Sequence, residues 1–162
     1  MKKLYAEHAG SLWVYGGVGV LRWDGSPASD WDSIANLPGR FVFGCAERSN
    51  EVWFACHAAQ GGTSGLLRWR DETWTQFPAE VQGTVGQSTD ESILFGGEGR
   101  FTLIDDSTGG EPATVIMPTR DVITGLVKDG DGRFWIGAGA GVYSFKPDRI
   151  PPQTHISAPV KA

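Results

Sequence analysis

A repeat of about 40 residues constrains the fold of this chain more than any other feature of its sequence. Each copy contains a large apolar residue, a glycine that opens a second apolar run, and a closing proline. The apolar positions are Trp13, Trp53, Leu94 and Trp135, the glycines are Gly19, Gly65, Gly99 and Gly141, and the prolines are Pro38, Pro78, Pro118 and Pro159. The apolar positions lie 40, 41 and 41 residues apart, and the prolines 40, 40 and 41. These columns indicate four copies of one structural unit, at about residues 1–38, 39–78, 79–118 and 119–159.

Each copy consists of short runs rich in Val, Ile, Phe, Trp and Tyr, separated by Gly, Asp, Ser and Asn, which is typical of strands and turns. We expect four antiparallel strands in each copy. In the fourth copy they are Val122 to Lys128, Arg133 to Ile136, Val142 to Phe145 and about Thr154 to Ser157. Four such strands in about 40 residues are typical of a β-propeller blade. The sequence therefore predicts an all-β fold, with one β-propeller domain of four blades over residues 1–162.

The column of large apolar residues is expected to pack between blades, because a blade buries both of its faces only against neighbours. Four blades close on themselves, remain a fragment with two bare faces, or pair with a second copy into an eight-bladed ring. Bare apolar faces favour association, and homo-oligomers are generally symmetric, so we expect a homodimer. Four further tryptophans form either a surface for sugars or proteins or, as we favour, additional packing between blades: Trp23, Trp31, Trp69 and Trp74.

The charge of the chain argues against two classes of partner. Fourteen Lys and Arg oppose nineteen Asp and Glu, which gives a net charge of −5, and no run of basic residues occurs. Nucleic acids and anionic membranes are therefore poor candidates, since affinity for both begins with a basic patch. No apolar run approaches the roughly 20 residues of a membrane span. We expect a cytoplasmic protein if the chain is complete, and a periplasmic one if it is a fragment of a sensor kinase.

The fourth copy carries a family resemblance. The segment Val122 to Pro147 resembles the two-component regulator propeller repeat at Asp129, Gly132, Phe134, Trp135, Ile136, Gly137, Gly141, Val142 and Phe145. The segment Asp148 to Ser157 is also similar to the chain that leaves the last blade in hybrid sensor kinases. The third copy departs from the pattern, because Leu94 replaces the tryptophan. The resemblance implies a sensing or interaction propeller without catalytic activity, and it names no ligand.

The sequence contains no nucleophile elbow, paired metal-binding histidines or phosphate-binding loop at a recognisable spacing. The run Asp129 to Gly132 is expected to form a hairpin turn rather than a calcium loop, because the further oxygen ligands are missing. The two cysteines, Cys45 and Cys56, are expected to be free thiols, with a cross-strand disulfide as the alternative. We therefore expect no metal and no cofactor.

Loops on one face of a propeller are the expected location of any ligand site, because function is often carried by loops on a rigid scaffold. His57 opens the longest loop within a copy. The candidate residues for binding a small polar ligand or a protein partner are Arg40, His57, Gln60, Glu80, Glu98, Arg120 and Asp121. The alternative is that these side chains form an ordinary solvated loop surface.

Three functions remain open. We favour a non-catalytic propeller that senses a ligand or binds a protein, similar to the sensor regions of two-component systems. The second is a carbohydrate-binding, lectin-like propeller. The third is an enzyme resembling streptogramin lyase, which would require a metal and a catalytic histidine, for which His57 is the candidate.

Overall fold

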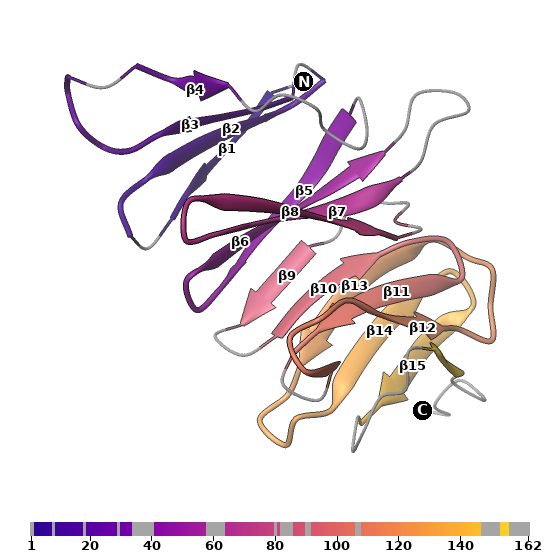
Figure 1. Ribbon diagram of the computed structural model, residues 1–162. Coiled ribbons are helices and arrows are strands. Elements are labelled where there is room, and N and C mark those ends of the chain that lie inside the picture. The colour runs from indigo at the N-terminus through magenta and orange to yellow at the C-terminus, as the bar shows by residue number, and fades with distance from the viewer. Residues whose placement is uncertain are drawn as a thin grey trace. The chain divides into compact units, whose positions relative to one another are not determined.

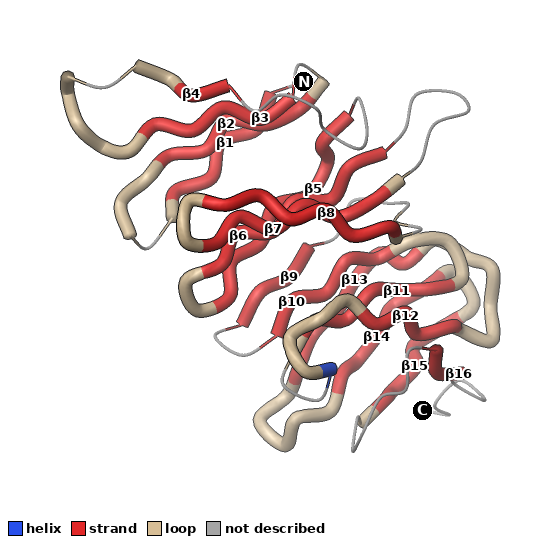
Figure 2. The backbone as a smooth tube through the Cα atoms, viewed as in Figure 1, coloured by secondary structure: helices blue, strands red, loops and turns tan. Residues whose placement is uncertain are grey.

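Strands form almost all of the regular structure in the part of the chain that is described, as the computed structural model in Figure 1 and Figure 2 shows. The short, β-branched and aromatic runs separated by glycine-rich turns account for this. No helix in the described part of the chain has the length and apolar character needed to cross a membrane. The contacts divide the chain into two compact units, residues 1–78 and 79–162. The structure describes residues 2–7, 9–17, 19–28, 30–33, 41–57, 64–79, 81, 86–89, 92–105, 108–146 and 153–155.

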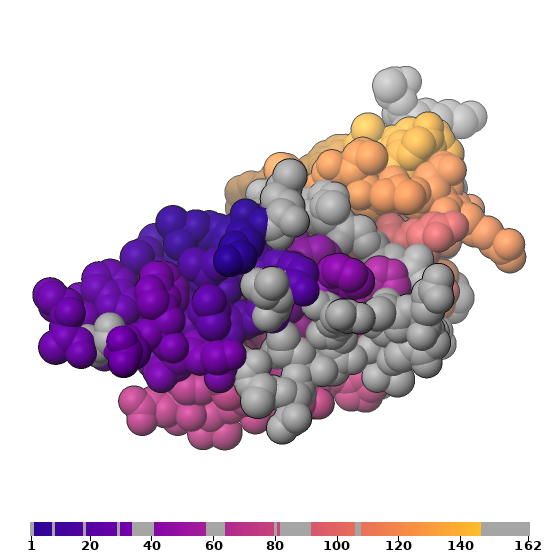
Figure 3. Space-filling view, turned by 90° about the horizontal axis from the view of Figure 1, so that it is seen from above, coloured from indigo at the N-terminus to yellow at the C-terminus, as the bar shows by residue number. Residues whose placement is uncertain are grey.

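The first unit contains two four-stranded antiparallel sheets, each with its strands in chain order. One sheet consists of β1 (Lys2–Ala6), β2 (Leu12–Gly16), β3 (Gly19–Trp23) and β4 (Asp32–Ser33). The other consists of β5 (Phe41–Arg48), β6 (Glu51–His57), β7 (Gly65–Arg70) and β8 (Thr73–Pro78). Figure 3 shows one face of this unit, coloured indigo to magenta, to which residues of both sheets contribute.

Trp13 of β2 lies fully buried in the gap between the two sheets of the first unit. Its ring centroid is 5.2 Å from that of Phe54 on β6, 5.9 Å from that of Trp69 on β7 and 5.8 Å from that of Trp74 on β8. The guanidinium of Arg22 lies over both the Trp13 and the Trp69 rings, at 5.5 Å and 5.2 Å. Aromatic packing supplemented by a cation–π contact therefore joins these sheets.

The second unit contains the remaining two sheets. One has the strand order β16-β12-β11-β10-β9, and the other β13-β14-β15. The core between them includes the buried residues Leu94, Phe101, Phe134, Ile136 and Tyr143. The strands are β9 (Gly86–Thr89), β10 (Ser92–Gly96), β11 (Arg100–Ile104), β12 (Ala113–Ile116), β13 (Ile123–Lys128), β14 (Phe134–Ala138), β15 (Gly141–Phe145) and β16 (Gln153–His155).

The fourth copy differs from the predicted four-stranded blade. The strand expected at Thr154 to Ser157 is represented by β16, which pairs in parallel with β12 of the preceding sheet and not with β15. In the described residues the fourth sheet thus has three strands and the third has five. The open edge of β12 offers backbone groups to any extended segment that reaches it, so a strand-like sequence alone does not determine the pairing partner. The all-β prediction is confirmed, and for the described residues the prediction of four strands in every blade is wrong.

Candidate functional site

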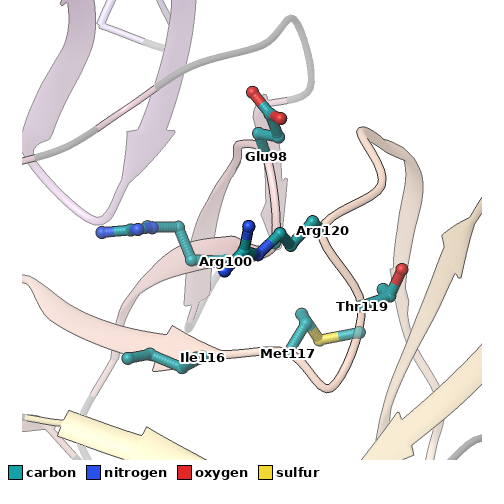
Figure 4. Close-up of a pocket in the computed structure, with 7 residues that line it drawn as sticks. Glu98, Arg100, Ile116, Met117, Thr119 and Arg120 are labelled. Atoms are coloured by element: carbon teal, nitrogen blue, oxygen red, sulfur yellow. The ribbon is translucent and has the colours of Figure 1, made fainter.

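A pocket of about 360 Å³ in the second unit is the principal candidate site. We call it the Arg120 pocket. Figure 4 shows it between β11, the end of β12 and the connections that follow β10 and β12. Its walls combine two guanidinium groups, one carboxylate, one hydroxyl and two apolar side chains. The residues are Glu98, Gly99, Arg100, Ile116, Met117, Thr119 and Arg120.

Backbone hydrogen bonds hold the two connections of the Arg120 pocket together. The Gly99 N–H donates to the Asp121 carbonyl at 3.1 Å, and the Met117 N–H donates to the Gly99 carbonyl at 2.9 Å. Gly99 has a φ of +65°, and a Cβ at this position would lie 2.9 Å from the Thr119 carbonyl oxygen. Both the conformation and the close approach require glycine. The glycine column of the repeat thus provides the position at which residues 117–121, which we call the Arg120 loop, pack against the connection between β10 and β11.

Asp121 stabilises the Arg120 loop from outside the pocket. The Thr119 hydroxyl donates to Asp121 Oδ2 at 2.6 Å, and the Asp121 N–H donates to Thr119 Oγ1 at 3.1 Å. Gly139 lies close to this carboxylate, since a Cβ there would be 3.2 Å from Asp121 Cγ. The Asp121 side chain is therefore engaged in holding the turn that presents Arg120, and it does not line the pocket.

The charged groups of the Arg120 pocket come from different elements. Arg100 lies on β11 directly opposite Ile116 of β12, so both side chains belong to one face of the sheet. Arg120 approaches from the connection between β12 and β13 (Figure 4). The Glu98 carboxylate points away from the two guanidinium groups in this view. Glu98 and Arg120 are exposed, and Arg100 is half-buried. The arrangement places an excess of positive charge at the pocket, in a chain whose net charge is −5.

The structure places the sequence-predicted site residues in three settings. Glu98 and Arg120 line the Arg120 pocket, and Asp121 supports its loop. His57 is exposed at the end of β6 in the first unit, where its Nδ1 lies 3.3 Å from the Ser64 hydroxyl. The other three candidates lie outside the described residues: Arg40, Gln60 and Glu80.

Sequence reasoning missed five residues of the Arg120 pocket: Gly99, Arg100, Ile116, Met117 and Thr119. Two signals were present for some of them. Gly99 belongs to the glycine column and is followed directly by Arg100, and the closing Pro118 stands between Met117 and Thr119. These signals mark connections in the chain, but they do not show that the two connections converge.

The cysteines have the character of structural thiols. Both Cys45 and Cys56 are free. Burial raises the pKa of the Cys56 thiol to about 12. The pKa of the Cys45 thiol is also raised, chiefly by burial and to a smaller extent by the negative charges of Glu47 and Glu7. A raised pKa leaves little thiolate, the reactive form of cysteine, at neutral pH. Within the described ranges, no three His, Cys, Asp or Glu side chains are grouped as a metal site would require.

Asp129 organises the hairpin between β13 and β14. Its Oδ1 accepts hydrogen bonds from the Asp131 and Arg133 N–H groups at 3.0 Å and 2.9 Å, and its Oδ2 accepts one from Trp135 Nε1 at 2.8 Å. The bond from Trp135, followed by the backbone bond from Arg133, lowers the pKa of this carboxyl. Asp129 therefore acts within a turn, as the hairpin prediction required.

The four additional tryptophans occupy different environments. Trp69 and Trp74 pack against Trp13, with a distance of 4.8 Å between their own ring centroids. Trp23 and Trp31 form a separate pair at 6.4 Å, in which Trp31 is 45 % exposed. Trp69 and Trp74 thus pack between sheets, whereas Trp31 presents part of its ring to solvent.

Comparison with known proteins shows a propeller-like fold and no family. No family model matches the chain, and no curated protein matches it significantly. One similar solved structure is PorZ of Porphyromonas gingivalis, a surface component of the type-IX secretion system (17 % identity, TM-score 0.61). Another is the extracellular domain from B. thetaiotaomicron described as part of the one-component system BT4673 (17 % identity, TM-score 0.61). Each match covers 91 % of this chain, which spans 26 % of PorZ and 21 % of the BT4673 structure.

An enzyme also shares the architecture. The structure of virginiamycin B lyase from Staphylococcus aureus is similar to this chain, with 16 % identity and a TM-score of 0.56. The match covers 96 % of this chain and 60 % of the lyase. At these identities the likeness shows the fold alone, because one fold supports unrelated functions. The similar structures thus include both an enzyme and the extracellular domain described as part of a one-component system.

Proposed function

We propose that this chain is a propeller module that binds a small polar ligand for sensing, without chemistry of its own. The observation that carries the proposal is the Arg120 pocket, which charged, polar and apolar residues line and whose two connections are held together by backbone hydrogen bonds. Such a combination of a concave site with a few polar groups is typical of small-molecule binding. The fold shared with the extracellular domain described as part of the one-component system BT4673 is consistent with this role.

The test is a ligand screen followed by mapping of the site. Neutral sugars, sugar acids, amino acids and short peptides are screened by thermal shift, and hits are mapped by amide chemical shifts in the intact chain. We expect a hit to perturb the amides of Gly99, Met117 and Arg120, and to be recovered unchanged after prolonged incubation. Consumption of a hit would contradict the absence of chemistry. No hit in the whole panel, or hits that map only elsewhere, would contradict the proposed site.

We also propose that two copies associate to complete an eight-bladed ring. Apolar side chains remain exposed on both terminal sheets: Leu4 on β1 is 65 % exposed, and Val127 on β13 and Val142 on β15 are each 50 % exposed. Exposed apolar sheet faces favour association with a complementary surface. Light scattering after size-exclusion chromatography is expected to give about twice the 17.4 kDa mass of the chain. A monomer at high protein concentration would exclude the ring of two copies.

A further inference from the structure

We propose that the Arg120 pocket selects a sugar acid, meaning a one-ring, hydroxyl-bearing ligand with a carboxylate. This inference rests on the proposed binding function and specifies its ligand class. Arg100 and Arg120 both line the pocket, and Arg120 is exposed whereas Arg100 is half-buried. In Figure 4 the Arg100 guanidinium extends away from Arg120. Guanidinium groups donate planar pairs of hydrogen bonds that match a carboxylate. Since Arg100 also interacts with another group of the protein, Arg120 is the main charge offered to the ligand.

The remaining walls specify the rest of the ligand. Ile116 and Met117 contribute an apolar surface, against which the C–H face of a sugar ring packs. The Glu98 carboxylate accepts hydrogen bonds and donates none when ionised, so it suits ligand hydroxyls and opposes a second acidic group. A volume of about 360 Å³ lies near the lower end of the range for small-molecule pockets. These features favour a small ring with several hydroxyls and one negative charge over a polyanion or a peptide.

The backbone around the pocket is arranged for binding before a ligand arrives. The hydrogen bonds from Gly99 to Asp121 and from Thr119 to Asp121 hold the loop that carries Arg120. A loop that is already ordered loses less conformational entropy on binding, so more of the contact energy appears as affinity. The conformational freedom that is lost on binding is therefore mainly that of the Arg120 side chain.

The test uses three probes and two variants of the intact chain. D-glucuronate carries ring and carboxylate, D-glucose carries the ring without the carboxylate, and sulfate carries charge without the ring. Titration calorimetry is expected to show that glucuronate binds at least tenfold more tightly than glucose or sulfate. Arg120→Gln is expected to weaken glucuronate binding by about tenfold or more, because a charge-assisted hydrogen bond is lost. Lys2→Gln makes the same charge change at an exposed residue of the first unit and is expected to leave the affinity unchanged.

The outcomes separate this inference from the proposed function. Equal affinity for glucose and glucuronate, or glucuronate binding that Arg120→Gln leaves intact, would overturn the sugar-acid assignment while the ligand-binding function stands. Sulfate binding as tight as glucuronate binding would also overturn it, because the site would then select charge alone. Failure of every probe here, together with failure of the broader screen, would overturn both. Loss of glucuronate binding on raising the salt concentration is expected in addition, since a charge on the surface is screened.

Discussion

Replacing Trp13 and Trp135 by alanine compares the same repeat position in two environments. Trp13 is fully buried, with three aromatic rings within 5.9 Å and an Nε1 hydrogen bond of 3.0 Å to Glu7. Truncation of a buried Trp costs about 3–5 kcal/mol, and the tightly packed rings around Trp13 place Trp13→Ala in the upper part of that range.

Trp135 has the same type of indole hydrogen bond, to Asp129 at 2.8 Å, but it is only half-buried. Among the described residues it has no aromatic ring contact and belongs to neither core cluster. Loss of one net hydrogen bond and of partial burial predicts a cost of about 1–2 kcal/mol for Trp135→Ala. The predicted difference between the two variants is therefore about 2–4 kcal/mol.

Urea denaturation followed by far-UV circular dichroism measures this difference without depending on tryptophan emission. Both variants are compared with the wild type at one low protein concentration, so that any association contributes equally. We expect a much lower midpoint for Trp13→Ala and a small shift for Trp135→Ala. Equal losses of unfolding free energy would refute the reasoning, because the repeat position rather than the surrounding sheets would then determine the contribution.

Three further predictions concern a glycine, a thiol and a carboxylate. Gly99→Ala is expected to lower the free energy of unfolding by about 1–3 kcal/mol, because Gly99 has a φ of +65° and an added Cβ would lie 2.9 Å from the Thr119 carbonyl oxygen. The control Gly130→Ala, where an added Cβ meets nothing within 4 Å, is expected to change it by less than about 0.5 kcal/mol in the same urea assay. Burial raises the pKa of the Cys56 thiol from 9.0 to about 12, so the contribution of the buried, neutral thiol to stability is complete below pH 9 and is lost as the pH rises toward 12. Urea midpoints that stay constant between pH 9 and pH 12 would contradict this prediction. The pKa of Asp129 is lowered from 3.8, chiefly by the Trp135 hydrogen bond, so the contribution of this carboxylate to stability is present above pH 3.8 and is lost on acidification. The urea midpoint of the wild type should therefore fall more steeply below about pH 4 than that of Asp129→Asn, and parallel profiles would show that the hydrogen bond contributes nothing.

The period of the sequence was sufficient to predict the strands but not all of their partners. Alternating apolar runs and glycine turns are local signals, and they correctly indicated an all-β, propeller-like chain. The pairing of β16 with β12 is a long-range choice between two open sheet edges. Nothing in the residues of a short strand specifies which edge it joins, so the predicted fourth strand of the last blade was assigned to the wrong sheet.

The site was predictable only in outline, for a related reason. Glu98 and Arg120 were selected because they lie on inter-strand connections, and both line the pocket. Asp121 was selected on the same grounds, but its carboxylate is bonded to Thr119 instead. Which side chain on a loop faces a cavity depends on the path of the backbone. Here that path depends on the close approach at Gly99, a three-dimensional feature that residue spacing does not contain.

The tryptophans of this chain make its two units optically distinguishable. Of the seven, six belong to the first unit, and Trp135 alone belongs to the second. Indoles as close as those of Trp69 and Trp74, 4.8 Å apart, exchange excitation, which gives a paired signal in circular dichroism that depends on their mutual orientation. The cluster around Trp13 thus serves as an intrinsic spectroscopic probe of the contact between two sheets. Trp135, half-buried beside Asp129, provides an independent emission signal for the other half of the molecule.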